Sequence, residues 1–176
     1  MMVEDFDPLS LLDRFKTSMR SAAASISLVT STDADGKYHG MAVTSWASLS
    51  MDPPSMLVAV NRSASVHAII SASRRFCLNL MSDTHSEILE RFSRSDMRDS
   101  RFTPEHWRAG PGGLPVLRDA LASQLCTVEA AHDYGTHTIF VGRVDGVFLL
   151  SSAGKDTNPL IWMNGSKVTL ANRYAD

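Results

Sequence analysis

The stretch GMAVTSWASLSMDPPSMLVAVNRSAS, residues 40–65, decides how the rest of the chain is interpreted. Its composition favours a sheet, with strands over 40–50 and 55–60 separated by Asp52-Pro53-Pro54, because proline cannot donate to a strand ladder. Hydroxyl side chains nevertheless surround a lone Trp46 where valine or isoleucine would suit a strand better. The first strand therefore raises the question of what its polar side does.

Alternation along a single strand over 40–50 predicts two faces of different character. One face carries Met41, Val43, Ser45, Ala47 and Leu49. The other is a polar face with one aromatic residue, and it carries Ala42, Thr44, Trp46, Ser48 and Ser50. A half-solvated sheet face explains this pattern without a ligand. A platform for a flat ligand with a polar edge explains it equally well, because small side chains let backbone groups approach ring heteroatoms and hydroxyls donate to a phosphate. The spacing alone leaves both interpretations open.

The rest of the chain predicts a mainly antiparallel β protein with peripheral helices. Strand patterns cover 24–32 and 74–81, two long strands flank the HDYG turn within 123–150, and a final hairpin turns at Asn164-Gly165 within 159–170. Helical spacing covers 65–73 and 84–93, and near the N-terminus it aligns Leu9, Leu12, Phe15 and Met19. Residues 94–116 are expected to form a long polar loop. About seven short strands without βαβ alternation indicate an antiparallel barrel.

Length and composition limit the class of protein. The 176 residues suit one domain spanning 1–176, and a net charge of −2 argues against nucleic acid or an anionic membrane as a partner. No apolar run is long enough to cross a bilayer, and the N-terminus does not resemble a signal peptide. Cys77 and Cys126 lie in apolar stretches, which favours buried thiols over a disulfide. A cytoplasmic protein is therefore expected.

Several familiar site motifs are absent from the sequence. It contains no GxGxxG after a strand, no GxxxxGK[ST], no CxxC, no HExxH and no GxSxG. His132 and His137 lie five residues apart without an evident third ligand, so no metal site is predicted. Asn79 interrupts an apolar strand, and structural bonding to a neighbouring loop is its expected role.

Resemblance to a known family extends this interpretation. The segment 40–65, followed in order by RFCLNL, ERFS, SRF, GTHTIFVGRV and PLIWMNG, resembles the flavin reductase family from about residue 12 to residue 170. The resemblance implies an FMN-binding split barrel, usually a homodimer, with NAD(P)H:flavin oxidoreductase activity. It also implies delivery of diffusible reduced flavin, FMN or FAD, to a separate monooxygenase, with NADH or NADPH as the co-substrate.

The resemblance also implies site residues, position by position. The segment expected along the flavin ring and its ribityl chain comprises Thr44, Ser45, Trp46, Ala47, Ser48, Leu49 and Ser50. The turn expected at the phosphate end comprises Asn61, Arg62, Ser63 and Ser65, and Arg101-Phe102 matches a pair that also touches flavin. The turn associated with the nicotinamide nucleotide comprises Met163, Asn164, Gly165 and Ser166. His137 matches the family's histidine, which is expected to act at the nicotinamide or at the flavin edge.

Two positions depart from the family pattern. Thr136 stands where the family has an aspartate before the histidine, so no carboxylate partner for His137 is expected from that position. Thr44-Ser45-Trp46 stands for Asn-Ser-Phe, which retains an aromatic side chain. Two alternatives stay open: a flavin-dependent reductase of another small acceptor, such as a corrinoid or ferric chelate, and a flavin-binding electron carrier without nicotinamide activity.

Overall fold

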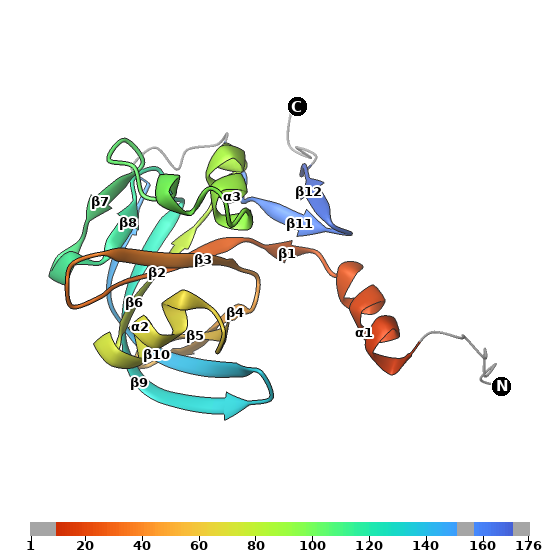
Figure 1. Cartoon of the computed structure of the whole chain (residues 1–176), viewed down its shortest axis with the longest axis horizontal. Coiled ribbons are helices and arrows are strands. Elements are labelled where there is room, and N and C mark those ends of the chain that lie inside the picture. The colour runs from red at the N-terminus through yellow and green to blue at the C-terminus, as the bar shows by residue number, and fades with distance from the viewer. Residues whose placement is uncertain (1–9, 151–156, 171–176) are drawn as a thin grey trace.

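The structure, a computed structural model, describes residues 10–150 and 157–170 (Figure 1). Its helices are α1 (Leu11–Arg20), α2 (Ser65–Ser73) and α3 (Ser86–Ser93), with 3-10 turns η1 (Arg98–Ser100) and η2 (Pro111–Gly113). Its strands are β1 (Ala24–Ser25), β2 (Ser27–Thr32), β3 (Tyr38–Val43), β4 (Trp46–Met51), β5 (Pro54–Asn61), β6 (Arg75–Leu80), β7 (Trp107–Ala109), β8 (Pro115–Leu117), β9 (Ala122–Tyr134), β10 (His137–Leu149), β11 (Ile161–Met163) and β12 (Ser166–Val168).

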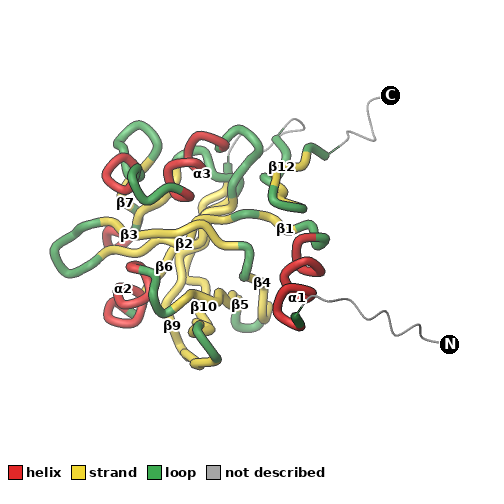
Figure 2. The backbone as a smooth tube through the Cα atoms, turned by 45° about the vertical axis from the view of Figure 1, so that its right-hand side comes forward, coloured by secondary structure: helices red, strands yellow, loops and turns green. Residues whose placement is uncertain are grey.

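One seven-stranded sheet forms the body of the protein, in the order β3-β2-β6-β9-β10-β5-β4. Every pairing within it is antiparallel. Figure 2 shows the strands gathered in the middle and the helices around them. β3 and β4 are consecutive in sequence but occupy opposite ends of the sheet, and within the described residues no ladder joins them. The predicted mainly antiparallel fold with peripheral helices is confirmed, as a barrel that stays open.

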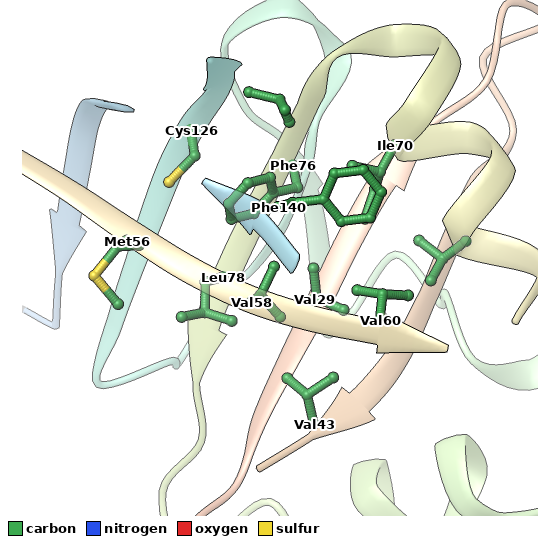
Figure 3. Close-up of a cluster of buried hydrophobic side chains, with 12 residues drawn as sticks. Val29, Val43, Met56, Val58, Val60, Ile70, Phe76, Leu78, Cys126 and Phe140 are labelled. Carbon is green, nitrogen blue, oxygen red and sulfur yellow. The ribbon is translucent and has the colours of Figure 1, made fainter. Parts of the chain in front are cut away.

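The main core lies inside this curved sheet. Met56, Val58 and Val60 alternate along β5 and are buried, while the residues between them are half-buried. Figure 3 shows Phe76 and Phe140 in the middle of the cluster. Each such side chain contributes about 1.5–3 kcal/mol by leaving water. Gly142 is required at this point, because a Cβ there would lie 2.6 Å from the Phe76 ring.

The expected single strand over 40–50 is wrong. The chain leaves β3 after Val43 and starts β4 at Trp46, so Thr44 and Ser45 form the bend between the two ends of the sheet. Ser45 fixes this bend through Ala59 of β5: its Oγ donates to the Ala59 carbonyl at 2.8 Å, and its own carbonyl accepts from the Ala59 N–H at 2.8 Å. A register shift between Ser48 and Ser50 then interrupts the alternation. The predicted face that runs from Thr44 to Ser50 therefore does not exist as one surface.

The expected long loop over 94–116 is also wrong in part. It contains η1, η2 and β7, and β7 pairs with β8 as a two-stranded sheet. Side chains of β2 hold this hairpin in place, because the Thr30 hydroxyl donates to the Pro115 carbonyl at 2.8 Å and the Thr32 hydroxyl to the Gly113 carbonyl at 2.7 Å. These bonds join residues more than 80 positions apart, so the local sequence does not reveal them.

Two smaller predictions for the core are confirmed. Asn79 is fully buried and bonds structurally: its side-chain carbonyl accepts from the Leu117 N–H at 3.0 Å and its amide donates to the Leu28 carbonyl at 3.3 Å. Cys77 and Cys126 are buried free thiols. Burial raises the pKa of the Cys126 thiol to about 12, so this cysteine stays protonated at neutral pH.

The predicted N-terminal helix is present as α1, but Leu9 lies outside the described residues. Ser10 caps it, because the Ser10 hydroxyl accepts from the Asp13 N–H at 3.2 Å and donates to the Asp13 carboxylate at 2.7 Å. None of its described side chains is buried. Within residues 10–150 and 157–170, no helix has the length and apolar run that crossing a membrane requires.

Candidate functional site

Some of the predicted site residues line two separate hollows, and the others lie outside both. The larger hollow is a groove of about 780 Å³ between α1 and the β11–β12 turn. It brings Thr44 together with Met163, Asn164 and Gly165, four of the residues predicted to contact flavin or the nicotinamide nucleotide. Asn164 and Gly165 form the predicted tight turn, with φ of 52° and 78°, and the Asn164 N–H donates to the Arg20 carbonyl at 2.7 Å. That bond attaches the turn to the end of α1.

Some polar side chains of the hydroxyl-rich segment form hydrogen bonds within the protein, and others do not. Ser45 bonds Ala59 as described above, the Trp46 indole N–H donates to the Ser25 carbonyl at 3.2 Å, and the Ser50 hydroxyl donates to the Asp52 carbonyl at 3.0 Å. In the described part of the chain, the hydroxyls of Thr44 and Ser48 have no hydrogen-bond partner, and both residues are exposed. Thr44 and Ser48 are therefore the side chains of this segment that are free to bind a ligand.

Trp46 packs partly against the main core and therefore contributes to the barrel as well as to any site. Its neighbours Ala47 and Leu49 are exposed on the outermost strand. β4 ends the sheet order, so the backbone groups on its outer edge lack a ladder partner among the described residues. This edge offers N–H donors and C=O acceptors to a flat polar ligand.

Hydrogen bonds of its side chains hold the turn after β5 in place. The Asn61 side-chain carbonyl accepts from the Ser63 N–H at 2.9 Å and from the Ser63 hydroxyl at 2.8 Å. Arg62 reaches across to the β9–β10 hairpin, where its guanidinium donates to the Gly135 carbonyl at 2.6 Å and lies 3.7 Å from the Asp133 carboxylate. Asn61, Arg62 and Ser63 are thus held in place by the protein, whereas Ser65 faces the second hollow.

The second hollow, of about 370 Å³, lies between the β2–β3 turn and the loop after α3. Its lining includes Ser65, from the turn predicted at the phosphate end, and also Arg101 and Phe102, the pair predicted to touch flavin. The Arg101 guanidinium, however, donates to the carbonyls of Arg91, Phe92 and Arg94, so it caps the end of α3. Burial, assisted by the nearby charge of Arg98, lowers the pKa of Arg101 from its usual value. The same residue therefore has a structural task at the wall of this hollow.

Phe102 also has a packing role. Its ring lies 5.5 Å from that of Tyr38, 5.4 Å from that of Phe92 and 4.8 Å from that of Trp107, measured between centroids. Such clusters of edge-to-face and tilted rings stabilise a structure beyond the area they bury. The pair Arg101-Phe102 thus holds the loop that forms one wall of the second hollow.

Two cations that were not predicted from the sequence, Lys37 and Arg98, also line the second hollow. Neither side chain has an ion-pair partner within the ranges that the structure describes. His39 lines the same hollow and bonds Asp33, with Nε2 2.8 Å from the carboxylate, and this bond lowers the pKa of Asp33. Lys37 and Arg98 are 61 positions apart and carry no shared motif, so only the fold reveals that they meet.

His137 lies at the start of β10, opposite Asn61 of β5. The residue is exposed, and its Nδ1 lies 2.9 Å from the Thr136 hydroxyl, which leaves Nε2 facing solvent. His137 lines neither hollow, nor do Ser45, Trp46, Ala47, Ser48, Leu49, Ser50, Asn61, Arg62, Ser63 and Ser166. Among the described residues, no three His, Cys, Asp or Glu side chains are grouped as a metal site requires.

Comparison with known proteins gives one consistent result. The family model described as "Flavin reductase like domain" matches residues 19–171. The reductase component of an FADH(2)-dependent resorcinol hydroxylase of Rhizobium sp. is 31% identical over 89% of this chain and 86% of its own length. The FMN reductase (NADH) RutF of Agrobacterium fabrum is 34% identical over 74% of each chain. The protein named "Probable flavin reductase" of Rhizobium meliloti is 33% identical over 82% of this chain, and the match spans 44% of that longer protein.

A solved structure agrees with the sequence matches. The styrene monooxygenase flavin reductase of Pseudomonas putida S12 superimposes with a TM-score of 0.77 at 26% identity. The superposition covers 90% of this chain and 99% of that one. The open antiparallel barrel described above is therefore shared with that enzyme.

Proposed function

This chain belongs to the flavin reductase-like domain family, and on that premise we propose that it transfers a hydride from NADH to a flavin, FMN or FAD, and supplies the reduced flavin to a separate monooxygenase. The relatives support both parts, because one is named as an FMN reductase (NADH) and another as the reductase component of a hydroxylase. The geometry that carries the proposal is the free edge of β4, where the hydroxyl of Ser48 on that strand and that of Thr44 in the bend before it have no hydrogen-bond partner among the described residues.

The side chains at the two hollows fit a flavin nucleotide. At the second hollow, Lys37, Arg98 and the Ser65 hydroxyl provide the cations and the donor that a phosphate requires. Along the β4 edge, unpaired backbone groups offer donors and acceptors to a ring with heteroatoms at its rim. In the groove, Thr44 lies with the Met163–Gly165 turn, and we assign this turn to the nicotinamide nucleotide.

The role of the protein in the reaction is to bind the flavin and the nicotinamide nucleotide and to orient them. A bound flavin supplies the chemistry, since it accepts the hydride that NADH gives up. The backbone N–H groups at the β4 edge would stabilise negative charge that develops on the ring, because they are fixed before the reaction begins. His137 presents Nε2 to solvent while the Thr136 hydroxyl orients the ring from the other side, so it can donate to a nicotinamide carboxamide or to the flavin rim.

We propose a single domain over 1–176 that works as a homodimer in the cytoplasm. Reduced flavin would reach the monooxygenase by diffusion. The known relatives that are reductase components of monooxygenases support a partner of this kind.

Two measurements test the proposed function. The absorption spectrum of the purified protein, titrated with FMN and FAD, reports flavin binding. Steady-state NADH oxidation with added free flavin reports turnover. Turnover that depends on free flavin supports the proposal. Flavin binding without NADH oxidation would identify an electron carrier, and turnover that requires a corrinoid or ferric chelate would identify a reductase of another acceptor.

A further inference from the structure

The tip of the β9–β10 hairpin, residues 131–137, lies at the edge of the molecule. Figures 1 and 2 both place the connection between β9 and β10 at the periphery. Each residue of the tip is exposed, and His137 is the last of them. Because exposed side chains bury little apolar surface, packing alone does not fix the direction of the His137 imidazole. Hydrogen bonds to the tip are needed to do so.

Arg62, in the turn after β5, supplies these bonds. Its backbone N–H donates to the Thr136 carbonyl at 2.9 Å. Its guanidinium donates to the Gly135 carbonyl at 2.6 Å and lies 3.7 Å from the Asp133 carboxylate. Gly135 and Thr136 are the two residues directly before His137. Arg62 therefore holds the turn that leads into His137 through both its backbone and its side chain.

The chemistry of the guanidinium suits this task. Its N–H donors point in fixed directions from one plane, so it can bond a carbonyl while it pairs with a carboxylate. Gly135 has a φ of 55°, and glycine has more backbone freedom than any other residue. A bond to its carbonyl therefore restricts the turn at its most adaptable residue.

Both ends of this connection are themselves fixed. Arg62 follows Asn61, whose side-chain carbonyl closes the turn by accepting from the Ser63 N–H and hydroxyl. On the hairpin, Asp133 directs Oδ2 toward Arg62 and accepts the hydroxyl of the buried Thr138 on Oδ1. An ion pair between two mobile surface side chains contributes little. Arg62 differs, because it joins two anchored points.

The location of Arg62 argues against a direct contact with phosphate. The resemblance implied that it lies at the phosphate end of the flavin, yet Arg62 lines neither hollow. Its guanidinium is bonded to the hairpin instead. Lys37 and Arg98 are cations that line the second hollow, where we place the phosphate. Arg62 is therefore available for a different role.

We infer that Arg62 is a positioning residue for His137: it fixes the hairpin turn so that the imidazole presents Nε2 in one direction. The β5–β10 ladder places His137 opposite Asn61, the residue before Arg62, so the connection is short. A displacement of about 1 Å in a positioned group can cost about 100-fold in rate. The effect on turnover rests on the proposed function, whereas the hold on the hairpin does not.

Single-turnover reduction of bound flavin by NADH tests the link to His137. The rate in Arg62→Ala should fall at least tenfold. The double variant Arg62→Ala/His137→Ala should be no slower than His137→Ala, because one residue acts through the other. Arg62→Lys should recover part of the rate, since its ammonium can pair with Asp133 but lacks the planar fork.

Arg74→Ala is the matched control. Arg74 is also exposed, and its guanidinium donates to a carbonyl of β9, that of Val128, at 2.8 Å. Val128 lies outside the tip, so this variant should reduce flavin at the wild-type rate. Circular dichroism should confirm that every variant is folded.

A second measurement reports the hold on the hairpin without any activity. Backbone order parameters from ¹⁵N relaxation should fall at Thr136 and His137 in Arg62→Ala, from about 0.85 to below about 0.6. They should stay unchanged in Arg74→Ala. Equal order parameters in Arg62→Ala and the wild type would contradict the inference, because the turn would then be rigid without Arg62.

The kinetic outcomes are equally decisive. Losses that multiply in the double variant would show that Arg62 acts independently of His137 and would overturn the inference. So would a normal rate at saturating flavin combined with weaker binding of FMN but not of riboflavin, since that result assigns Arg62 to the phosphate. If the wild-type protein oxidises no NADH with any flavin, the proposed function fails, and the order parameters still decide whether Arg62 holds the hairpin.

Discussion

His67 of α2 and Thr138 of β10 form a hydrogen bond of 2.7 Å between Nε2 and Oγ1. Thr138 is buried, and its hydroxyl donates to the Asp133 carboxylate at 2.5 Å on the neighbouring strand. A hydroxyl has one proton to donate, so His67 must carry its own proton on Nε2 and donate it to Thr138. This chain of bonds ties α2 to the hairpin that presents His137.

We expect Thr138→Val to destabilise the fold by about 1–3 kcal/mol, because the half-buried His67 N–H loses its acceptor. The midpoint of urea unfolding measures the change. Thr136→Val is the matched control: it makes the same substitution at an exposed hydroxyl two residues away and should change stability by less than about 0.5 kcal/mol. Equal effects in the two variants would show that the His67–Thr138 bond contributes nothing specific.

His137→Ala should keep flavin affinity and thermal stability but lose about 10- to 100-fold in NADH turnover, or about 1.4–2.7 kcal/mol of transition-state stabilisation. The residue is exposed, and within the described ranges its side chain bonds only that of its neighbour Thr136, so its truncation opens no cavity. Stopped-flow reduction of bound flavin measures the step directly. Lower stability with normal turnover per folded molecule would instead assign His137 to the hairpin.

Ser48→Ala should weaken flavin binding by about 0.5–1.5 kcal/mol, which is about 2- to 12-fold in Kd, because Ser48 is an exposed hydroxyl with no bond to the described protein. Quenching of flavin fluorescence measures the affinity. Ser50→Ala is the control, since its hydroxyl is already engaged with the Asp52 carbonyl. If Ser50→Ala weakens binding as much as Ser48→Ala does, the two hydroxyls do not differ in their access to flavin.

Arg98→Ala should weaken FMN binding about tenfold, or about 1.4 kcal/mol, and should leave riboflavin binding unchanged. Arg98 lines the second hollow, where we place the phosphate, and riboflavin has none. Titrations with the two ligands separate a phosphate contact from a general loss of structure. Arg143→Ala removes a cation that pairs with Glu129 on the surface and should affect neither ligand. A loss of riboflavin affinity in Arg98→Ala would move the phosphate elsewhere.

Local sequence signals were sufficient to predict much of the fold. The Asn164-Gly165 turn, the two long strands around HDYG and the helices over 65–73 and 84–93 follow from turn chemistry and periodicity, and the structure contains them. The bend at Thr44-Ser45 could not be predicted in this way, because Ser45 is held by Ala59 on another strand. The alternation rule assumed an unbroken strand and so assigned a face that does not exist.

The candidate site, like the fold, could be predicted from the sequence only in part. Resemblance named Ser65, Arg101-Phe102, Thr44 and Met163–Gly165 separately, and the fold brings Ser65 together with Arg101-Phe102 and Thr44 together with Met163–Gly165. It did not indicate that the Arg101 guanidinium caps α3, nor that Lys37 and Arg98 meet at the second hollow. Those arrangements depend on loops that pack against each other from distant parts of the chain, and no local pattern encodes them.

The buried imidazole of His85 should make the stability of the fold depend on pH. The side chain is buried, and its Nδ1 accepts the Ser82 N–H at 3.0 Å, so burial lowers the pKa of His85, outweighing the attraction of Asp119 and Asp83. Below about pH 6.5 the His85 imidazole binds a proton in the unfolded chain but not in the folded chain. The free energy of unfolding is therefore highest above that pH and falls as the pH decreases toward 5. His85→Asn keeps an acceptor for Ser82 but does not titrate. Urea unfolding between pH 5 and pH 8 should therefore be flatter in His85→Asn than in the wild type, whereas the exposed control His132→Asn should retain the wild-type slope. An equally steep loss in His85→Asn would assign the pH dependence to other groups.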